Sequence, residues 1–184
     1  MTELTPDWPP HFRKYGIHLC PVTDADLELI RGWRNDQEIN QHMLDQSYIT
    51  QQMQQAWFKR LQGDTSQVYW LIMFKDEKIG VASLTNIDRE KGTAEPGMYI
   101  FTEKYKNNIV PFCAAFALND FAFEQLGSQQ LKGKIFDNNG ASLRFHQSCG
   151  YVQVGEAEAG LLHFVLTADQ YIPARDKISH FIRY

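Results

Sequence analysis

The stretch Thr93–Gly127, TAEPGMYIFTEKYKNNIVPFCAAFALNDFAFEQLG, decides the fold of this chain. Residues 93–101 have the composition of a strand, residues 102–108 form a polar loop, and a helix follows. Pro111 suits the first turn of this helix and Gly127 suits its end. Apolar side chains cover most of the helix, so it is expected to lie at the centre of the fold. Four polar residues are expected to form its narrow solvent-facing side: Asn119, Asp120, Glu124 and Gln125.

A buried helix that follows a strand through a short loop presents unpaired N–H groups and a positive dipole end to one spot. Such a spot favours anions, and phosphate groups in particular. A plain strand–loop–helix of any α/β core has the same pattern. The stretch alone therefore predicts a central helix and leaves the anion site as one of two interpretations.

Length and composition indicate one globular domain. The chain has 184 residues and a net charge of -4, which argues against a nucleic-acid binder. Its N-terminus lacks the apolar core of a signal peptide, and no apolar run approaches the roughly 20 residues that span a bilayer. Three cysteines without CxxC spacing favour reduced thiols and a cytoplasmic location.

The order of expected elements predicts a mixed α/β (α+β) fold. Residues 1–16, which contain three prolines, are expected to form an irregular arm before a single domain at 17–184. The expected sheet has six to seven strands and is mostly antiparallel, with a splayed parallel pair at its centre and helices on both sides. Strands are expected at 17–22, 67–74, 78–87, 93–101, 130–136, 151–156 and 161–167. Helices are expected at 24–35, 38–44, 50–62, 110–126 and 139–149, with two short pieces around Pro173.

Residues 137–151, DNNGASLRFHQSCGY, resemble the second signature of the GCN5-related N-acetyltransferase (GNAT) superfamily. The element order above matches that fold over nearly the whole chain. The segment GWRNDQEINQHM, followed by Ile49-Thr50 and Trp57-Phe58, is similar to the branch of ribosomal-protein and antibiotic acetyltransferases. Within it, the resemblance is greatest to the UDP-aminosugar N-acetyltransferases of pseudaminic-acid synthesis. The signature residues are Asn139, Ala141, Ser142, Phe145, Gly150 and Tyr151.

This resemblance implies that acetyl-CoA lies between the strands at 93–101 and 130–136, with its pyrophosphate at the loop before the central helix. That loop departs from the family pattern, because Ile109 and Pro111 fill positions that are usually small, while Lys106 keeps the positive charge. Pro111 has no N–H, so one phosphate donor is lost. The implied cofactor-binding residues are Ile100, Phe101, Thr102, Lys106, Asn107, Asn108, Ile109, Val110, Asn139 and Ser142.

The resemblance also implies two catalytic groups. His146 stands where the family often has a Tyr that protonates the departing thiolate, and a histidine can donate that proton when charged. Glu95 and Asp88 are candidates for the base that takes the amine proton. An ordinary position without a catalytic task is also compatible with each side chain: a solvated turn or edge for Glu95 and Asp88, and the helix surface for His146.

The acceptor is expected against the early helices and the strand at 78–87, and the best match is the 4-amino group of a UDP-linked aminodideoxy sugar. Arg34 is expected to hold a phosphate of the nucleotide. Gln54 stands where these enzymes can have a His, so that contact stays open. The remaining acceptor-binding candidates are Met43, Trp57, Thr85 and Asn86.

Two other functions remain open at this stage. One is acetylation of a protein N-terminus or an aminoglycoside, for which Asp45, Asp88 and Glu95 would supply an acidic groove. The other is a non-catalytic GNAT-like binding domain, which the altered loop favours. The six histidines show no ligand spacing, so no metal centre is predicted. Both a monomer and a homodimer are compatible with the sequence.

Overall fold

A computed structural model describes residues 7–184, and residues 1–6 of the predicted arm lie outside this range. The chain forms one eight-stranded sheet with the order β1-β2-β3-β4-β5-β6-β8-β7. Its strands are β1 (Phe12–Lys14), β2 (Ile17–Pro21), β3 (Val68–Phe74), β4 (Glu77–Asp88), β5 (Thr93–Ile100), β6 (Gln130–Phe136), β7 (Val152–Glu158) and β8 (Leu161–Thr167). Its helices are α1 (Leu27–Asn35), α2 (Gln37–Asn40), α3 (Gln51–Leu61), α4 (Val110–Asp120), α5 (Gly140–Ser148) and α6 (Ala168–Ser179).

The mixed sheet with a central parallel pair is confirmed. Among the strands of residues 7–184, only β5 and β6 run parallel, and their register holds two pairs, Thr93 with Gln130 and Ala94 with Leu131. The sheet has one strand more than expected, because residues 12–14 of the predicted irregular arm pair with β2 as β1. Within residues 7–184, no helix combines the length and apolar character that crossing a membrane requires.

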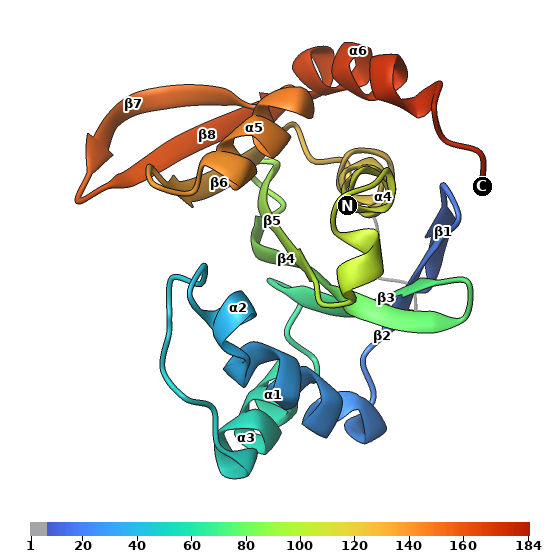
Figure 1. The fold of residues 1–184 in the computed structure, drawn as a ribbon, viewed down its shortest axis with the longest axis vertical. Coiled ribbons are helices and arrows are strands. Elements are labelled where there is room, and N and C mark those ends of the chain that lie inside the picture. The colour runs from blue at the N-terminus through green and yellow to red at the C-terminus, as the bar shows by residue number, and fades with distance from the viewer. Residues whose placement is uncertain (1–6) are drawn as a thin grey trace.

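The predicted central helix is the middle of the core. Figure 1 shows α4 on one side of the sheet formed by β2–β5 and the helices α1–α3 on the other. From Val110 to Asp120 almost every residue of α4 is buried, and the helix continues as a π-helical turn, Phe121–Gln125, up to Gly127. The expected solvent-facing side was wrong in part, because Asn119 and Asp120 are 3% and 1% exposed.

Asp120 is buried because the two ends of the chain supply its partners. Its carboxylate lies 2.7 Å from the Lys14 ammonium and 3.0 Å from the Arg175 guanidinium. The hydroxyls of Tyr15 and Tyr171 donate to it at 2.5 and 2.6 Å. Burial alone would raise the pKa of Asp120, but these four hydrogen bonds outweigh it and hold the pKa below its usual value.

The same contacts explain why the tail is one helix. Two pieces separated around Pro173 were predicted, yet α6 runs through the proline. Proline removes one helical hydrogen bond, but Tyr171 and Arg175 stand on either side of it and both bind Asp120. These two contacts fasten both turns of α6 to α4, so the helix continues.

The helices on the other side of the sheet differ from expectation in two places. The second helical piece ends at Asn40, so Met43 and Leu44 lie outside it, and Leu44 is 61% exposed. Helix α3 was expected to begin at Thr50 and begins one residue later, because Thr50 is its N-cap and its hydroxyl accepts from the Met53 N–H at 3.2 Å. Its buried side chain is Gln54, which donates to the Leu27 carbonyl, and this contact gives Gln54 a structural task.

Candidate functional site

The edge of β5 is open beyond its two pairs with β6. The Phe101 N–H donates 2.7 Å to the Ile79 carbonyl of β4. Backbone groups alternate in direction along a strand, so those of Met98 and Ile100 point to the β6 side, where no register pair meets them. Pro96 lies on the same side and needs no hydrogen bond there. The edge therefore offers backbone groups to an extended ligand.

Two of the predicted cofactor contacts need correction here. The N–H groups of Phe101 and Thr102 both donate to the Ile79 carbonyl, at 2.7 and 3.3 Å, and so turn away from the gap. Of the predicted three, Ile100 keeps the proposed role, and Met98 joins it. An extended chain of amides, such as pantetheine, fits this edge because it can add to a strand without side-chain contacts.

The loop before α4 offers fewer phosphate donors than a glycine-rich loop. The Asn108 side chain accepts from the Val110 N–H at 2.9 Å, and Pro111 has none to give. Lys106 lies 2.8 Å from Glu103 and 3.3 Å from Glu38. A phosphate bound to Lys106 would therefore compete with two carboxylates. The side chain of Val110 is buried in the core, that of Ile109 packs against the core, and Asn107 is exposed.

Helix α5 positions His146 beside the helix α4 side of the sheet. Its N-cap is Asn139, whose side chain accepts from the Ser142 N–H. The His146 ring lies 5.0 Å from the Tyr151 ring, and its Nδ1 donates 2.8 Å to the Ser142 carbonyl. Burial lowers the pKa of His146, so the ring is neutral at neutral pH with Nε2 as an acceptor. This tautomer supplies no acidic proton at Nε2.

The opposite side of the sheet holds buried polar atoms that no described residue satisfies. They include Nη1 of Arg34, at the end of α1, and the hydroxyl of Tyr99 on β5. Burial raises the pKa of the Tyr99 phenol, and the charge of Arg34 acts in the opposite direction on both Tyr99 and Tyr69. An unsatisfied buried polar atom costs about 1–3 kcal/mol, so such atoms point to a ligand with oxygen acceptors.

Aromatic rings surround these polar atoms. Trp33 stands edge-on to Tyr99 at 6.4 Å, and Trp57 of α3 stands edge-on to Tyr69 at 5.0 Å. The small residues Ser83 and Gly97 lie opposite each other in the floor between Tyr69 and Tyr99. Figure 1 shows α1–α3 over this side of the sheet. The predicted wall residue Trp57 therefore belongs to this surface.

The other predicted acceptor contacts lie at the ends of this surface. Thr85 pairs with Glu95 across β4 and β5. Asn86 is exposed and has a φ of 47°, at an irregularity in β4. Met43 lies in the turn after α2, and the Gln46 side chain donates to its carbonyl at 3.2 Å.

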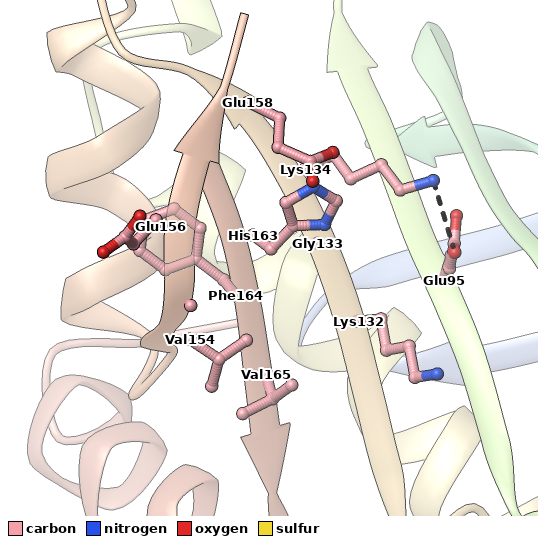
Figure 2. Close-up of a pocket in the computed structure, with 11 residues that line it drawn as sticks. Glu95, Lys132, Gly133, Lys134, Val154, Glu156, Glu158, His163, Phe164 and Val165 are labelled. Carbon is pink, nitrogen blue, oxygen red and sulfur yellow. Dashed lines mark ion pairs between the residues drawn. The ribbon is translucent and has the colours of Figure 1, made fainter. Parts of the chain in front are cut away.

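A cavity of about 480 Å³ opens beside Glu95 on the same side of the sheet. Figure 2 shows Glu95 of β5 and Lys134 of β6 reaching toward each other, with His163 beside them. The Lys134 ammonium lies 3.9 Å from the Glu95 carboxylate, across the gap where the two strands diverge. Leu131 and Ile135 of β6 are buried against α4, so Glu95 and His146 lie on opposite sides of the sheet.

The acidic groove proposed for a cationic acceptor is not assembled. Asp45 accepts from the Ser47 N–H at 3.0 Å, and Asp88 accepts from the Lys91 N–H at 2.9 Å, so both carboxylates close their own turns. Glu95 faces Lys134. Among residues 7–184, Nη1 of Arg34 has no hydrogen-bond partner on this surface, although the charge of Arg34 acts on Asp45.

Comparison of this chain with known protein families agrees with the geometry described above. Residues 17–152 match the model of the acetyltransferase (GNAT) domain. The chain therefore belongs to the GNAT family and is an N-acetyltransferase whose acyl donor is acetyl-CoA. The resemblance seen in residues 137–151 is confirmed.

Individual relatives show which members of the GNAT family this chain is similar to. The acetyltransferase PseH of Campylobacter jejuni subsp. jejuni serotype O:23/36 (strain 81-176) is 29% identical over 68% of this chain and 76% of its own length. A structure of C. jejuni PseH with acetyl coenzyme A has a TM-score of 0.65 at 22% identity, covering 83% of this chain and 99% of that one. FdhC, a nucleotide-linked sugar GNAT, has a TM-score of 0.78 at 19% identity over 95% and 99%. Spermidine N-acetyltransferase of Vibrio cholerae, with CoA and spermine, reaches 0.76 at 16% identity over 86% and 99%.

Three residues of the candidate site were not predicted from the sequence. Tyr69 and Tyr99 were expected only to form part of strands, and no role in the site was predicted for Met98. Alternation in VYWLIMF and in GMYIF carries the signal, because it places Tyr69 and Tyr99 on the face opposite the buried residues. Their approach to Arg34 depends on where α1 crosses the sheet. No local sequence pattern determines that crossing.

Proposed function

We propose that this enzyme acetylates the 4-amino group of a UDP-linked aminodideoxy sugar. The observation that supports it is that Nη1 of Arg34 and the Tyr99 hydroxyl are both buried without a hydrogen-bond partner among residues 7–184, and that the charge of Arg34 acts on Tyr99. Guanidinium binds phosphate oxygens in a fixed fork geometry, and a phenol adds a third donor. The flanking rings of Trp33 and Trp57 suit a base and a sugar. The relatives PseH and FdhC support the same class of acceptor.

The chemistry joins the amine nitrogen to the acetyl carbonyl carbon and breaks the carbon–sulfur bond of the thioester. Acetyl-CoA supplies the activated acetyl group. The open edge at Met98 and Ile100 orients it, and Arg34 and Tyr99 orient the acceptor from the other side of the sheet. Because the enzyme holds both reactants in line, the bimolecular reaction becomes effectively unimolecular. This positioning supplies most of the rate enhancement.

Two groups handle protons in this proposal. Glu95 lies on the acceptor side and takes the proton that the amine loses. His146 lies on the other side and begins as a neutral ring with Nε2 as an acceptor. It therefore has to take up a proton before it can give one to the departing thiolate. The structure thus favours a relay through His146 over a ring that is charged at rest.

The alternatives have less support. A cationic acceptor, such as an aminoglycoside or a polyamine, would meet the positive charge of Arg34 and no assembled acidic groove. A non-catalytic domain is favoured only by the loop at Lys106–Pro111, where the Lys106 ammonium forms ion pairs with Glu38 and Glu103.

The test is release of free coenzyme A from acetyl-CoA with a UDP-linked 4-amino-4,6-dideoxy sugar, together with the mass gain of one acetyl group on the sugar. Spermidine, an aminoglycoside and a peptide N-terminus form the comparison panel, and the same sugar with its amine blocked is the control. Turnover with a panel member but not with the sugar contradicts the proposed acceptor. Absence of calorimetric heat with acetyl-CoA would favour the non-catalytic domain.

A further inference from the structure

Two histidines and a cysteine meet at the edge of the sheet, far along the strand order from the β5–β6 gap. They are His11, just before β1, and His18 and Cys20 on β2. One ligand atom from each lies within 4.8 Å of the other two. The sequence predicted no metal centre because these residues lack a familiar spacing. Pairing of β1 with β2 brings them together, since Phe12 lies opposite Leu19 and His11 is therefore carried next to Cys20.

The backbone fixes this cluster on one face. Ile17 and Leu19 are buried on the α4 side, so His18 and Cys20 alternate to the other side. The residue before His11 is also held, because the Trp70 indole N–H donates 2.8 Å to the Pro10 carbonyl. The three side chains thus come from positions that the sheet already holds in place, which lowers the ordering cost of binding an ion.

The two imidazoles are arranged as they would be around one ion. Nδ1 of His11 lies 2.8 Å from Nε2 of His18, and the rings stack with centroids 5.1 Å apart. A single proton holds these nitrogens together, since one must donate and the other accept. Two nitrogens bound tetrahedrally at about 2.0–2.1 Å from Zn²⁺ lie about 3.3 Å apart. An ion can therefore replace the shared proton after a small widening.

We propose that His11, His18 and Cys20 bind one Zn²⁺ ion, with the fourth tetrahedral position open to water. The donor set of two imidazoles and one thiolate suits Zn²⁺ and disfavours Mg²⁺ and Ca²⁺, which take oxygen ligands. His11 is exposed, so an ion can enter from solvent. The site lies on β1 and β2, and Cys20 packs against the apolar cluster around Trp33 that Tyr69 and Tyr99 also contact.

The surrounding charges partly cancel. Arg13 lies opposite His18 in the register of β1 and β2, and its charge opposes a cation. Because cysteine binds metals as the thiolate, the ion displaces the proton of the Cys20 thiol. Asp26 is paired with Lys78 at 2.8 Å.

The test uses the full chain stripped of metal with a chelator. Co²⁺ titration is expected to give the visible bands of a tetrahedral ion and a thiolate charge-transfer band, saturating at one ion per chain. Zn²⁺ is expected to bleach these bands and to raise Tm. Cys20→Ser should abolish the charge-transfer band, and His18→Asn should weaken Zn²⁺ binding at least about tenfold.

Controls separate this site from other thiols and imidazoles. His180→Asn removes an exposed histidine near the C-terminus and should leave the titration unchanged. Because Cys20→Ser touches a partly buried position, His11→Asn repeats the test at an exposed one, where folding is not at risk. Absence of a cobalt spectrum, or a spectrum unchanged in Cys20→Ser and His11→Asn, overturns the proposal.

Discussion

The surroundings of Asp120 and those of Arg34 place charged atoms out of water on opposite sides of the same sheet. Asp120 receives two cations and two phenol hydroxyls, at distances from 2.5 to 3.0 Å. Nη1 of Arg34 receives no partner from the described residues, and its other nitrogen Nη2 makes one contact of 3.4 Å with the Asp45 carbonyl. The protein itself supplies all the partners of the Asp120 carboxylate, whereas the described residues supply none for Nη1 of Arg34.

This difference separates a structural charge from a functional one. A buried carboxylate with four partners repays its desolvation only while all of them are present. A buried guanidinium nitrogen with no partner weakens the folded protein, and the proposed anionic acceptor would supply the missing partner. The two regions should therefore respond oppositely to removal of their charge.

Asp120→Ala should have the largest effect, on stability. It removes the buried carboxylate that Lys14 and Arg175 share and frees α6 around Pro173, so the free energy of unfolding should fall by about 3–5 kcal/mol. Chemical denaturation at neutral pH measures it. The depressed pKa means that the contribution of Asp120 is complete above about pH 3.9, the unfolded value, and is lost as pH falls through the folded pKa.

The matched control is Glu124→Gln. Glu124 also contacts Lys14, at 3.3 Å, but its side chain is 47% exposed. Exposed pairs contribute about 0–1 kcal/mol, so this variant should unfold close to wild type. Equal losses of unfolding free energy in the two variants would mean that burial does not make the contribution of Asp120 larger than that of Glu124.

Arg34→Met should act on binding and leave stability unchanged or slightly raised. A charge-assisted hydrogen bond contributes about 1.5–3 kcal/mol, so KM for the nucleotide-sugar should rise about 10- to 100-fold with little change in Tm. Tyr99→Phe, which removes only the unpartnered hydroxyl, should raise KM about tenfold. Steady-state kinetics and thermal unfolding measure both effects.

Arg60→Met is the control for Arg34, because Arg60 is exposed in the last turn of α3. Its KM should match wild type. A fall in Tm of Arg34→Met with unchanged KM would make Arg34 a structural charge like Asp120, and the contrast between the two regions would disappear.

The elements that sequence could predict are those set by local pattern. Strand β6 was predicted with the bounds that it has, and the start of α3 was predicted to within one residue, at Thr50. Asp120 was misplaced because its partners come from positions 14, 15, 171 and 175, which a helical pattern does not contain. Tyr99 and the cluster of His11 with Cys20 were missed for the same reason, since strand pairing or helix crossing brings their partners together.

The smallest effect concerns the pH dependence of turnover through His146. Its pKa lies below the usual value of about 6.5 because the ring is buried, and its Nδ1 proton is held by the Ser142 carbonyl. If the neutral ring is the working form, kcat stays constant above neutral pH and falls about tenfold for each pH unit below that pKa. A ring that works as a charged acid gives the opposite slope, with kcat rising as the pH is lowered. The pH profile of kcat in wild type and in His146→Gln decides this, because Gln keeps a polar group near Nε2 but cannot titrate, and its profile should lose the acidic limb.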